Sequence, residues 1–251
     1  MMGKVILVGA GPGDPELLTF KAARAIERAT VLLVDDLVSD GVLTFASAKA
    51  RVVHVGKRGG CASTPQAFID KLMLAEALKG ETVVRLKGGD PFMFGRGGEE
   101  ADRLRAHGVD VDVVGGITSG MAAAAALGVP LTHRNHAHGV IFVTGHARAD
   151  GAALDWPTLG AAAAQGLTLV IYMGVSAIDV LSHGLLQTLL GATPAAVVQH
   201  ASLPQQRVLS CTLTTLAASV NGARIGSPAI VIVGNVLYGL QGLARPETRA
   251  A

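Results

Sequence analysis

Short apolar runs alternate with helix-like stretches through the first half of the chain, and this alternation constrains the fold more than any other feature. Amphipathic stretches such as Phe68–Leu78 separate the runs, and Ser63-Thr64-Pro65-Gln66 before it predicts an N-cap with a capping-box glutamine. Strands alternating with helices predict βαβ units and a mostly parallel sheet. Five runs rich in β-branched residues are predicted to be the strands: Val5–Val8, Val31–Val34, Val52–Val55, Val83–Leu86 and Val111–Val114.

The second half, after Leu127–Gly139, has a different pattern, with fewer helices between the apolar runs. Two neighbouring runs there favour an antiparallel or mixed sheet. The predicted organisation is α/β, with two α/β domains at residues 1–133 and 138–245 and a boundary near Thr132–His138. The strands predicted in this half are Val140–Thr144, Leu167–Met173, Ala195–Gln199, Val208–Leu213 and Ala229–Val233.

Composition excludes several classes of protein and partner. Of the 251 residues, 50% are hydrophobic and 16% are charged, which is typical of a globular protein and not of a disordered chain. Apolar segments stay well short of the roughly 18 residues that span a bilayer, so no membrane association is expected. A net charge of +2 and an aromatic content of 4% argue against nucleic acid as a partner.

The cysteines and histidines indicate neither a disulfide framework nor a metal site. Cys61 and Cys211 are too few for a framework and are expected to be free thiols in a reducing cytoplasm. The stretch "HRNHAH" (His133–His138) has no cysteine or acid to complete a metal site, so no metal is expected. The start of the chain leads directly into a strand without the pattern of a signal peptide, which also favours a cytoplasmic location.

The first predicted strand ends in a glycine-rich turn, "VGAGPGD" (Val8–Asp14), that suggests a dinucleotide site. Gly9 and Gly11 match the first two glycines of that fingerprint, but Asp14 stands at the third position. Asp14-Pro15 is typical of a helix N-cap followed by proline at the first helical position. Asp35 lies about where a ribose-binding acid would be, so NAD binding remains an alternative, although a disfavoured one.

A second glycine-rich stretch, "RLKGGDPFMFGRGGEE" (Arg85–Glu100), is more specific. It holds five glycines within eleven residues, a density that costs backbone entropy on folding and therefore needs a reason. Neither loop is a nucleotide-binding P-loop, because the pattern G-x-x-x-x-G-K-[ST] does not occur in the sequence.

Taken together, the motifs of this chain resemble the tetrapyrrole methylase family, and within it the stand-alone members that methylate uroporphyrinogen III. The resemblance covers about Gly3 to Gly234. Its motifs are "VGAGPGD", "LVSD" (Leu37–Asp40), "VGKRGG" (Val55–Gly60), "RLKGGDPFMFGRGGEE", "GITSG" (Gly116–Gly120), "PLTHR" (Pro130–Arg134), "VTGH" (Val143–His146), "YMG" (Tyr172–Gly174) and "SPAIVIVG" (Ser227–Gly234).

The resemblance implies two α/β domains with S-adenosylmethionine bound in the cleft between them and S-adenosylhomocysteine as its product. It implies a homodimer and a small-molecule tetrapyrrole substrate, methylated twice by way of precorrin-1 to precorrin-2. The cofactor contacts implied by motif match are Pro12, Gly88, Gly89, Asp90, Met93, Thr118, Ser119, Met173 and Ala201.

The resemblance also implies roles for charged residues. Asp35 and Lys57 match the positions of a proton acceptor and a proton donor, and Arg96 competes for the proton-handling role. The substrate carries eight carboxylates, which the guanidinium fork of arginine binds well, so Arg96 and Arg134 are predicted to bind it, with Glu99 holding Arg96 or a pyrrole N–H.

Other interpretations of the same residues stay open. Asp35 is also typical of a solvated strand-end acid, Arg96 and Glu99 of a surface ion pair, and Met173 of core packing. Alternative functions are a sibling methylase acting on a later corrin intermediate or on the diphthamide precursor of a translation factor, and a non-catalytic protein that binds the cofactor.

Overall fold

The computed structural model describes residues 2–56, 64–146 and 154–240, and the chain divides into two compact units, residues 1–119 and 120–251. All ten predicted strands are present, each shifted by no more than one residue at either end. No helix in the described ranges is long and apolar enough to cross a membrane.

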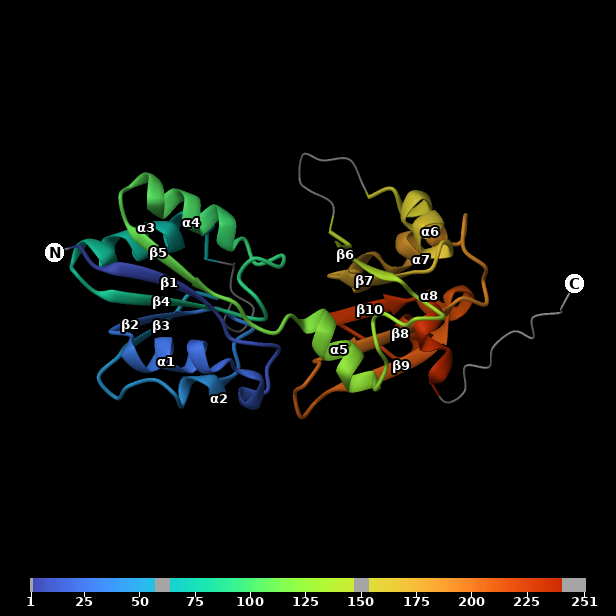
Figure 1. Ribbon diagram of the computed structural model, residues 1–251, viewed down its shortest axis with the longest axis horizontal. Helices are drawn as coiled ribbons and strands as arrows, with labels where there is room; N and C mark the ends of the chain where they lie inside the picture. The colour runs from blue at the N-terminus through green and yellow to red at the C-terminus, as the bar shows by residue number, and fades with distance from the viewer. Residues whose placement is uncertain (1, 57–63, 147–153, 241–251) are drawn as a thin grey trace, which may run out of the picture. The chain divides into compact units, whose positions relative to one another are not determined.

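The first unit is a five-stranded sheet in the order β3-β2-β4-β1-β5, and each of its pairs is parallel. Helices cover both faces, α3 and α4 on one and α1 and α2 on the other (Figure 1). The elements are β1 (Lys4–Gly9), a 3-10 turn (Pro15–Leu17), α1 (Phe20–Arg28), β2 (Val31–Val34), α2 (Asp40–Leu43), β3 (Arg51–His54), α3 (Gln66–Leu78), β4 (Thr82–Lys87), α4 (Gly97–Ala106) and β5 (Asp110–Val114).

Burial on both faces explains why these strands are continuous apolar runs. In β1, Val5 and Leu7 belong to the core under α3 and α4, whereas Ile6 and Val8 belong to the core under α1 and α2. Side chains alternate between the two faces of a strand, so both sets must be apolar.

The second unit is a mixed sheet in the order β6-β7-β10-β8-β9, as the adjacent runs predicted. Among the strands that the structure describes here, β6 and β7 alone pair in parallel; β10 is antiparallel to β7 and β8, and β9 is antiparallel to β8. The elements are α5 (Ser119–Leu127), β6 (Gly139–Thr144), α6 (Trp156–Ala164), β7 (Leu167–Tyr172), α7 (Ile178–Leu185), β8 (Pro194–Gln199), β9 (Arg207–Thr212), α8 (Leu216–Gly222) and β10 (Ala229–Val233), with 3-10 turns at Val175–Ala177, Leu213–Thr215 and Asn235–Gly239.

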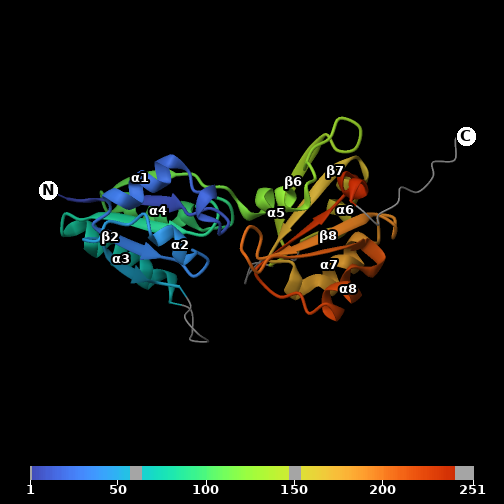
Figure 2. The same ribbon diagram turned by 90° about the horizontal axis from the view of Figure 1, so that it is seen from below.

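Helices α6, α7 and α8 pack on one face of this sheet, where Leu169 and Ile171 of β7 contribute to the core; α7 and α8 are seen from below in Figure 2. The start of α5 lies against the other face. A Cβ on Gly120 would lie 2.5 Å from Tyr172 Oη and 2.7 Å from Val170 Cγ1, so only glycine allows this approach.

Two details differ from the sequence analysis. The division between the units falls at Ser119–Gly120 and not near Thr132–His138, because Gly120 N donates to Tyr172 Oη at 2.9 Å and seats α5 on the second sheet. The N-cap predicted for α3 is wrong: Pro65 occupies the cap position and no side chain caps the helix, while Ser63 lies outside the described residues.

Candidate functional site

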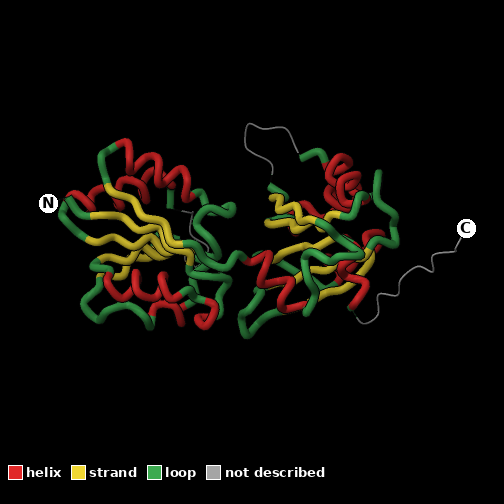
Figure 3. Tube along the Cα trace, viewed as in Figure 1, coloured by secondary structure: helices red, strands yellow, loops and turns green. Residues whose placement is uncertain are grey.

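The predicted site residues of the first unit follow the carboxyl ends of its strands. Asp35 follows β2, the Gly88-Gly89-Asp90 turn follows β4, and Thr118 ends the loop after β5, directly before Ser119 at the start of α5. Pro12 lies in the turn after β1, and Met93 lies three residues beyond Asp90. Because all strands are parallel, these loops gather at one edge of the sheet (Figure 3), where open α/β sheets bind their ligands.

The two glycine-rich loops are joined to each other. Gly89 N donates to Gly11 O at 2.7 Å, and Gly11 N donates to Gly89 O at 3.2 Å. Both glycines have positive φ, 73° at Gly11 and 70° at Gly89, which side chains with a Cβ rarely adopt. The prediction that Asp14 caps the next turn is confirmed, because its side chain accepts from Glu16 N at 2.9 Å.

Asp90 ties the loop after β4 to the loop after β5. Its Oδ1 accepts from Phe92 N at 2.8 Å, and its Oδ2 accepts from Gly116 N at 3.0 Å. Each carboxylate oxygen can accept a second hydrogen bond. Asp90 therefore fixes the local backbone and keeps the capacity to bind hydroxyl donors.

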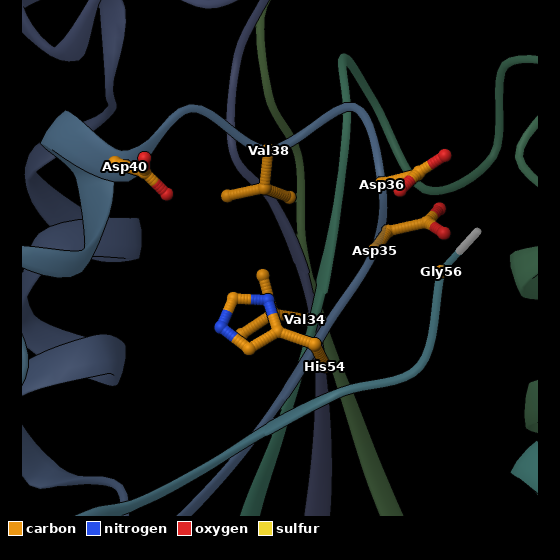
Figure 4. Close-up of a pocket in the computed structure, with 7 residues that line it drawn as sticks. All are labelled: Val34, Asp35, Asp36, Val38, Asp40, His54 and Gly56. Atoms are coloured by element: carbon orange, nitrogen blue, oxygen red, sulfur yellow. The ribbon is translucent and has the colours of Figure 1, made fainter. Parts of the chain in front are cut away.

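A pocket of about 270 Å³ lies at the end of β2. Figure 4 shows the carboxylates of Asp35 and Asp36 on the side of Gly56, with Asp40 entering from α2. The pocket is lined by Val34, Asp35, Asp36, Val38, Asp40, His54 and Gly56. Lys57, the predicted proton donor, follows Gly56 in sequence and lies outside the described residues.

Arg96 is the residue directly before α4, and it is exposed. Its Nε and a terminal nitrogen donate to the two oxygens of Glu99, at 3.2 and 2.8 Å. These hydrogen bonds raise the pKa of Arg96 and lower the pKa of Glu99. The surface ion pair that the sequence left open is therefore formed, with both groups presented to solvent.

Three charged residues that the sequence analysis did not single out lie buried beneath this edge. Arg85 and Lys87 project from β4 to the same carboxylate, Glu100 of α4. Arg85 also lies 3.7 Å from Asp35 Oδ1. Part of the signal was present in the sequence, because Arg85 is a cation inside the run Val83–Leu86 predicted as a strand and Lys87 directly follows that run.

The second unit carries the remaining predicted residues. Met173 follows β7 with φ of 53°, an unusual backbone conformation for methionine, and is partly exposed. Ala201 is buried in the loop after β8, next to His200, whose φ is 51°. Arg134 is exposed in the turn before β6. Strained residues after strands mark functional loops, which favours this edge of the second sheet as a site.

Chemically, these residues offer carboxylates for hydroxyl and N–H donors, arginines for anions, and backbone groups in glycine-rich turns. Among the described residues, no group of three or more His, Cys, Asp or Glu could hold a metal ion.

Comparisons with known proteins add independent findings. The profile of the tetrapyrrole (corrin/porphyrin) methylases matches residues 4–217. A uroporphyrinogen-III C-methyltransferase of Pseudomonas aeruginosa is 50% identical over 237 residues, 94% of this chain and 95% of its own length. A siroheme synthase of Azotobacter vinelandii is 46% identical over 237 residues, which are 94% of this chain and 50% of that protein.

A solved structure is also similar. The uroporphyrin-III C-methyl transferase from Thermus thermophilus, in complex with S-adenosylhomocysteine, is 40% identical, with a TM-score of 0.80 over 95% of this chain and 100% of that one.

Proposed function

The chain belongs to the tetrapyrrole methylase family, and from that premise we propose that it transfers methyl groups from S-adenosylmethionine to ring carbons of uroporphyrinogen III. Two successive transfers give precorrin-1 and then precorrin-2, on the route to sirohaem or cobalamin-type tetrapyrroles. The observation that carries this proposal is the 50% identity to a uroporphyrinogen-III C-methyltransferase over nearly the whole length of both chains.

The described residues fit the cofactor chemically. Asp90 is partly buried, and each of its oxygens can accept a further hydrogen bond from a ribose hydroxyl. Gly88 and Gly89 belong to the same turn, and Thr118 and Ser119, at the end of the next loop and the start of α5, add hydroxyls. We assign Pro12 and Met93 to the same site, and Met173 and Ala201 to the part contributed by the second unit.

The substrate side of the site is assigned to the arginines. Arg96 and Arg134 are exposed, and each can bind a carboxylate of the substrate in bidentate geometry. Glu99 holds the Arg96 guanidinium through two hydrogen bonds and so limits its orientations. A carboxylate that approaches Arg96 must share or displace this contact.

The reaction forms one carbon–carbon bond and breaks one carbon–sulfur bond. When bound, S-adenosylmethionine supplies a methyl group on a sulfonium centre, whose sulfur leaves with the bonding electron pair as a neutral thioether. The substrate carbon supplies the electrons of the new bond, and the substrate then loses a proton. Asp35, with its carboxylate at the pocket after β2, accepts this proton. Lys57 is assigned as a proton donor by motif match alone, and the net transfer written here takes no proton from it.

Assembly and location are part of the same proposal. A chain with a mean hydropathy of +0.45 has apolar surface to bury, which supports a two-fold homodimer. Sedimentation at micromolar concentration is expected to give twice the chain mass of 25.5 kDa; a stable monomer contradicts the dimer.

A cytoplasmic location is proposed because the substrate is a reduced porphyrinogen, which a reducing compartment preserves.

Incubation of the purified chain with uroporphyrinogen III and methyl-labelled S-adenosylmethionine tests the function. Two labelled methyl groups per tetrapyrrole are expected, with a singly labelled intermediate that appears first. Labelling of a later precorrin in place of uroporphyrinogen III would instead identify a sibling methylase. Binding of S-adenosylhomocysteine without turnover of either substrate would indicate a non-catalytic binding protein.

A further inference from the structure

Three charged side chains form a compact cluster inside the first unit. The side chains of Arg85 and Lys87 are 2% and 4% exposed, and that of Glu100 is fully buried. Lys87 Nζ lies 3.0 Å from both oxygens of Glu100, and Arg85 Nε lies 3.4 Å from Glu100 Oε1. Gln66 of α3 donates to the same Oε1 at 2.9 Å. The cluster therefore links β4, α3 and α4.

The stability of the folded protein does not by itself explain why these three charges are buried. The attraction within a buried ion pair often fails to offset the cost of removing both ions from water, and apolar replacements are often neutral or stabilising. Burial, and the positive charge of Arg85 beside it, lower the pKa of Lys87. The attraction of Glu100 for the Lys87 ammonium is therefore smaller than these two opposing effects. Glu100 Oε2 is buried and has no hydrogen bond within the described residues beyond its ion pair with Lys87.

The cluster reaches the candidate site through one side chain. Arg85 lies between Glu100 and Asp35, with its NH2 atom 3.7 Å from Asp35 Oδ1. Its NH1 atom also donates to the carbonyls of Leu33 and Leu86, at 3.4 and 3.1 Å. The guanidinium is thus fixed on several sides. Asp35, by contrast, is 34% exposed and lines the pocket.

We propose that Arg85, held in place by Glu100 and Lys87, is a positioning residue that fixes the Asp35 carboxylate at the pocket for proton transfer. Arg85 touches neither substrate nor cofactor in this role; it acts through Asp35. The negative charge of Glu100 offsets one of the two buried cations, and Lys87 prevents Glu100 from drawing the guanidinium away from Asp35. The inference rests on the proposed function, since it gives Asp35 a proton to accept.

A double-mutant cycle on kcat tests this role with Asp35→Asn, Arg85→Gln and the double variant in the full-length protein. Loss of the proton acceptor is expected to lower kcat about 10²- to 10⁴-fold. Arg85→Gln is expected to lower kcat about tenfold or more, with KM for uroporphyrinogen III and affinity for S-adenosylhomocysteine within about twofold of wild type. The double variant should be no slower than Asp35→Asn alone, because nothing remains to be positioned.

Additive losses in the cycle would overturn the proposal, because a structural defect acts whether or not Asp35 is present. An Asp35→Asn variant with wild-type kcat would overturn it as well. A wild-type protein without turnover of uroporphyrinogen III would instead refute the proposed function itself. Arg51→Gln serves as the matched control: Arg51 pairs with Glu76 elsewhere in the same unit, so its loss should affect stability and leave kcat unchanged.

A second variant covers the case in which Arg85→Gln does not fold. Arg85→Met combined with Lys87→Met and Glu100→Met replaces the whole cluster by apolar groups of similar size. We expect its thermal midpoint to be at or above that of the wild type and its kcat to fall about tenfold or more. A folded triple variant with wild-type kcat would show that the cluster has no part in the reaction.

Discussion

Arg96 adopts a backbone conformation that arginine has no local reason to adopt. Its φ of 59° lies in the left-handed region, where a residue with a Cβ is strained by about 1–2 kcal/mol. The exposed pair with Glu99 recovers only about 0.2–0.5 kcal/mol. Local energetics therefore favour glycine at this position, and an arginine here is better explained by a ligand than by the fold.

Replacement of Arg96 should separate activity from stability. Arg96→Lys is expected to lower kcat/KM about ten- to a hundredfold, since an ammonium cannot reproduce the bidentate fork and one charge-assisted contact is worth about 1.5–3 kcal/mol. Arg96→Gly should lose at least as much activity while its urea midpoint stays equal to or above that of the wild type. Steady-state kinetics and urea unfolding measure these two effects, and calorimetry with S-adenosylhomocysteine measures the affinity for the cofactor product.

Arg28→Lys, at the exposed end of α1, is the matched control and should change neither quantity. Normal turnover in Arg96→Lys would reduce Arg96 to a surface charge. Loss of S-adenosylhomocysteine binding in a folded Arg96→Lys variant would move the residue to the cofactor site.

At the scale of elements, glycines at the end of β1 and after β5 allow backbone segments to pack directly against one another. A Cβ on Gly9 would lie 2.6 Å from Gly116 N and 2.7 Å from Gly89 O, and a Cβ on Gly116 would lie 2.3 Å from Gly89 O. The loops after β1, β4 and β5 thus touch without side chains between them. The many glycines in these motifs are therefore explained by this contact between backbones, and a ligand that approaches the same loops is a second reason for them.

Gly9→Ala is expected to destabilise the protein, because the new methyl group meets backbone atoms that cannot rotate away. Overpacking of this kind costs about 1–3 kcal/mol. Gly98→Ala is the matched control, since nothing lies within 4 Å of its Cβ position in α4, and it should stabilise by about 0.5–1 kcal/mol. Urea unfolding measures both, and equal midpoints for the two variants would contradict the packing.

A second contact between elements joins β3 to α3. Glu76 is buried on α3 and pairs with Arg51 at the start of β3 and with Lys79 Nζ at 3.0 Å. The hydrogen bond from Arg51 chiefly lowers the pKa of Glu76 below its ordinary value of 4.5. A carboxylate whose pKa is lower in the folded state stabilises that state above the unfolded pKa, and this stabilisation is lost as the pH falls through the folded pKa.

Glu76→Gln should therefore be less stable than the wild type at pH 7 by about 1.5 kcal/mol. This value is at the low end for a charge-assisted hydrogen bond, because the side chains of Arg51 and Lys79 are each about half exposed. The difference should shrink as the pH falls below 4.5. Urea titrations from pH 3 to 7 measure it. A deficit that stays constant down to the lowest pH would mean that packing of the side chain, and not its charge, is responsible.

Local patterns predicted the strands because β-branched runs and their glycine boundaries are properties of neighbouring residues. The same holds for Asp14 before its turn. The charge cluster could be predicted only in part. Arg85 and Lys87 are recognisable in the sequence as cations in and next to an apolar run, but their partner Glu100 becomes a neighbour only when α4 packs on the sheet. The predicted cap of α3 failed because Pro65 takes the cap position and Gln66 donates to Asp70 and Glu100 instead.

At the scale of the whole molecule, the predicted cofactor contacts belong to both units. Asp90 belongs to the first, and Met173 and Ala201 belong to the second. Each group follows the end of a strand within its own unit. If S-adenosylmethionine contacts residues of both units, as we propose, its affinity must depend on residues of both, and no single unit holds the complete site.

Single substitutions in each unit test this dependence in the full-length protein. Asp90→Asn should weaken S-adenosylhomocysteine binding about tenfold or more, through the loss of a charge-assisted hydrogen bond to the ribose. Met173→Ala keeps the same left-handed backbone strain and removes only the thioether side-chain contact. We therefore expect the affinity for S-adenosylhomocysteine to fall about tenfold, which corresponds to about 1.5 kcal/mol for an apolar side chain removed from contact. Calorimetry measures both affinities.

The controls are substitutions of the same kind at exposed positions, Asp102→Asn on α4 and Met121→Ala on α5. Both should bind S-adenosylhomocysteine as the wild type does, with unchanged thermal midpoints. If Asp90→Asn weakens binding and Met173→Ala does not, the cofactor is held by the first unit alone, and the second sheet must serve the substrate or the dimer. If both weaken it, the ligand must contact both units. In either case, saturation of the wild type with S-adenosylhomocysteine at a hundred times its dissociation constant should stabilise the native state that binds it by about 2.7 kcal/mol.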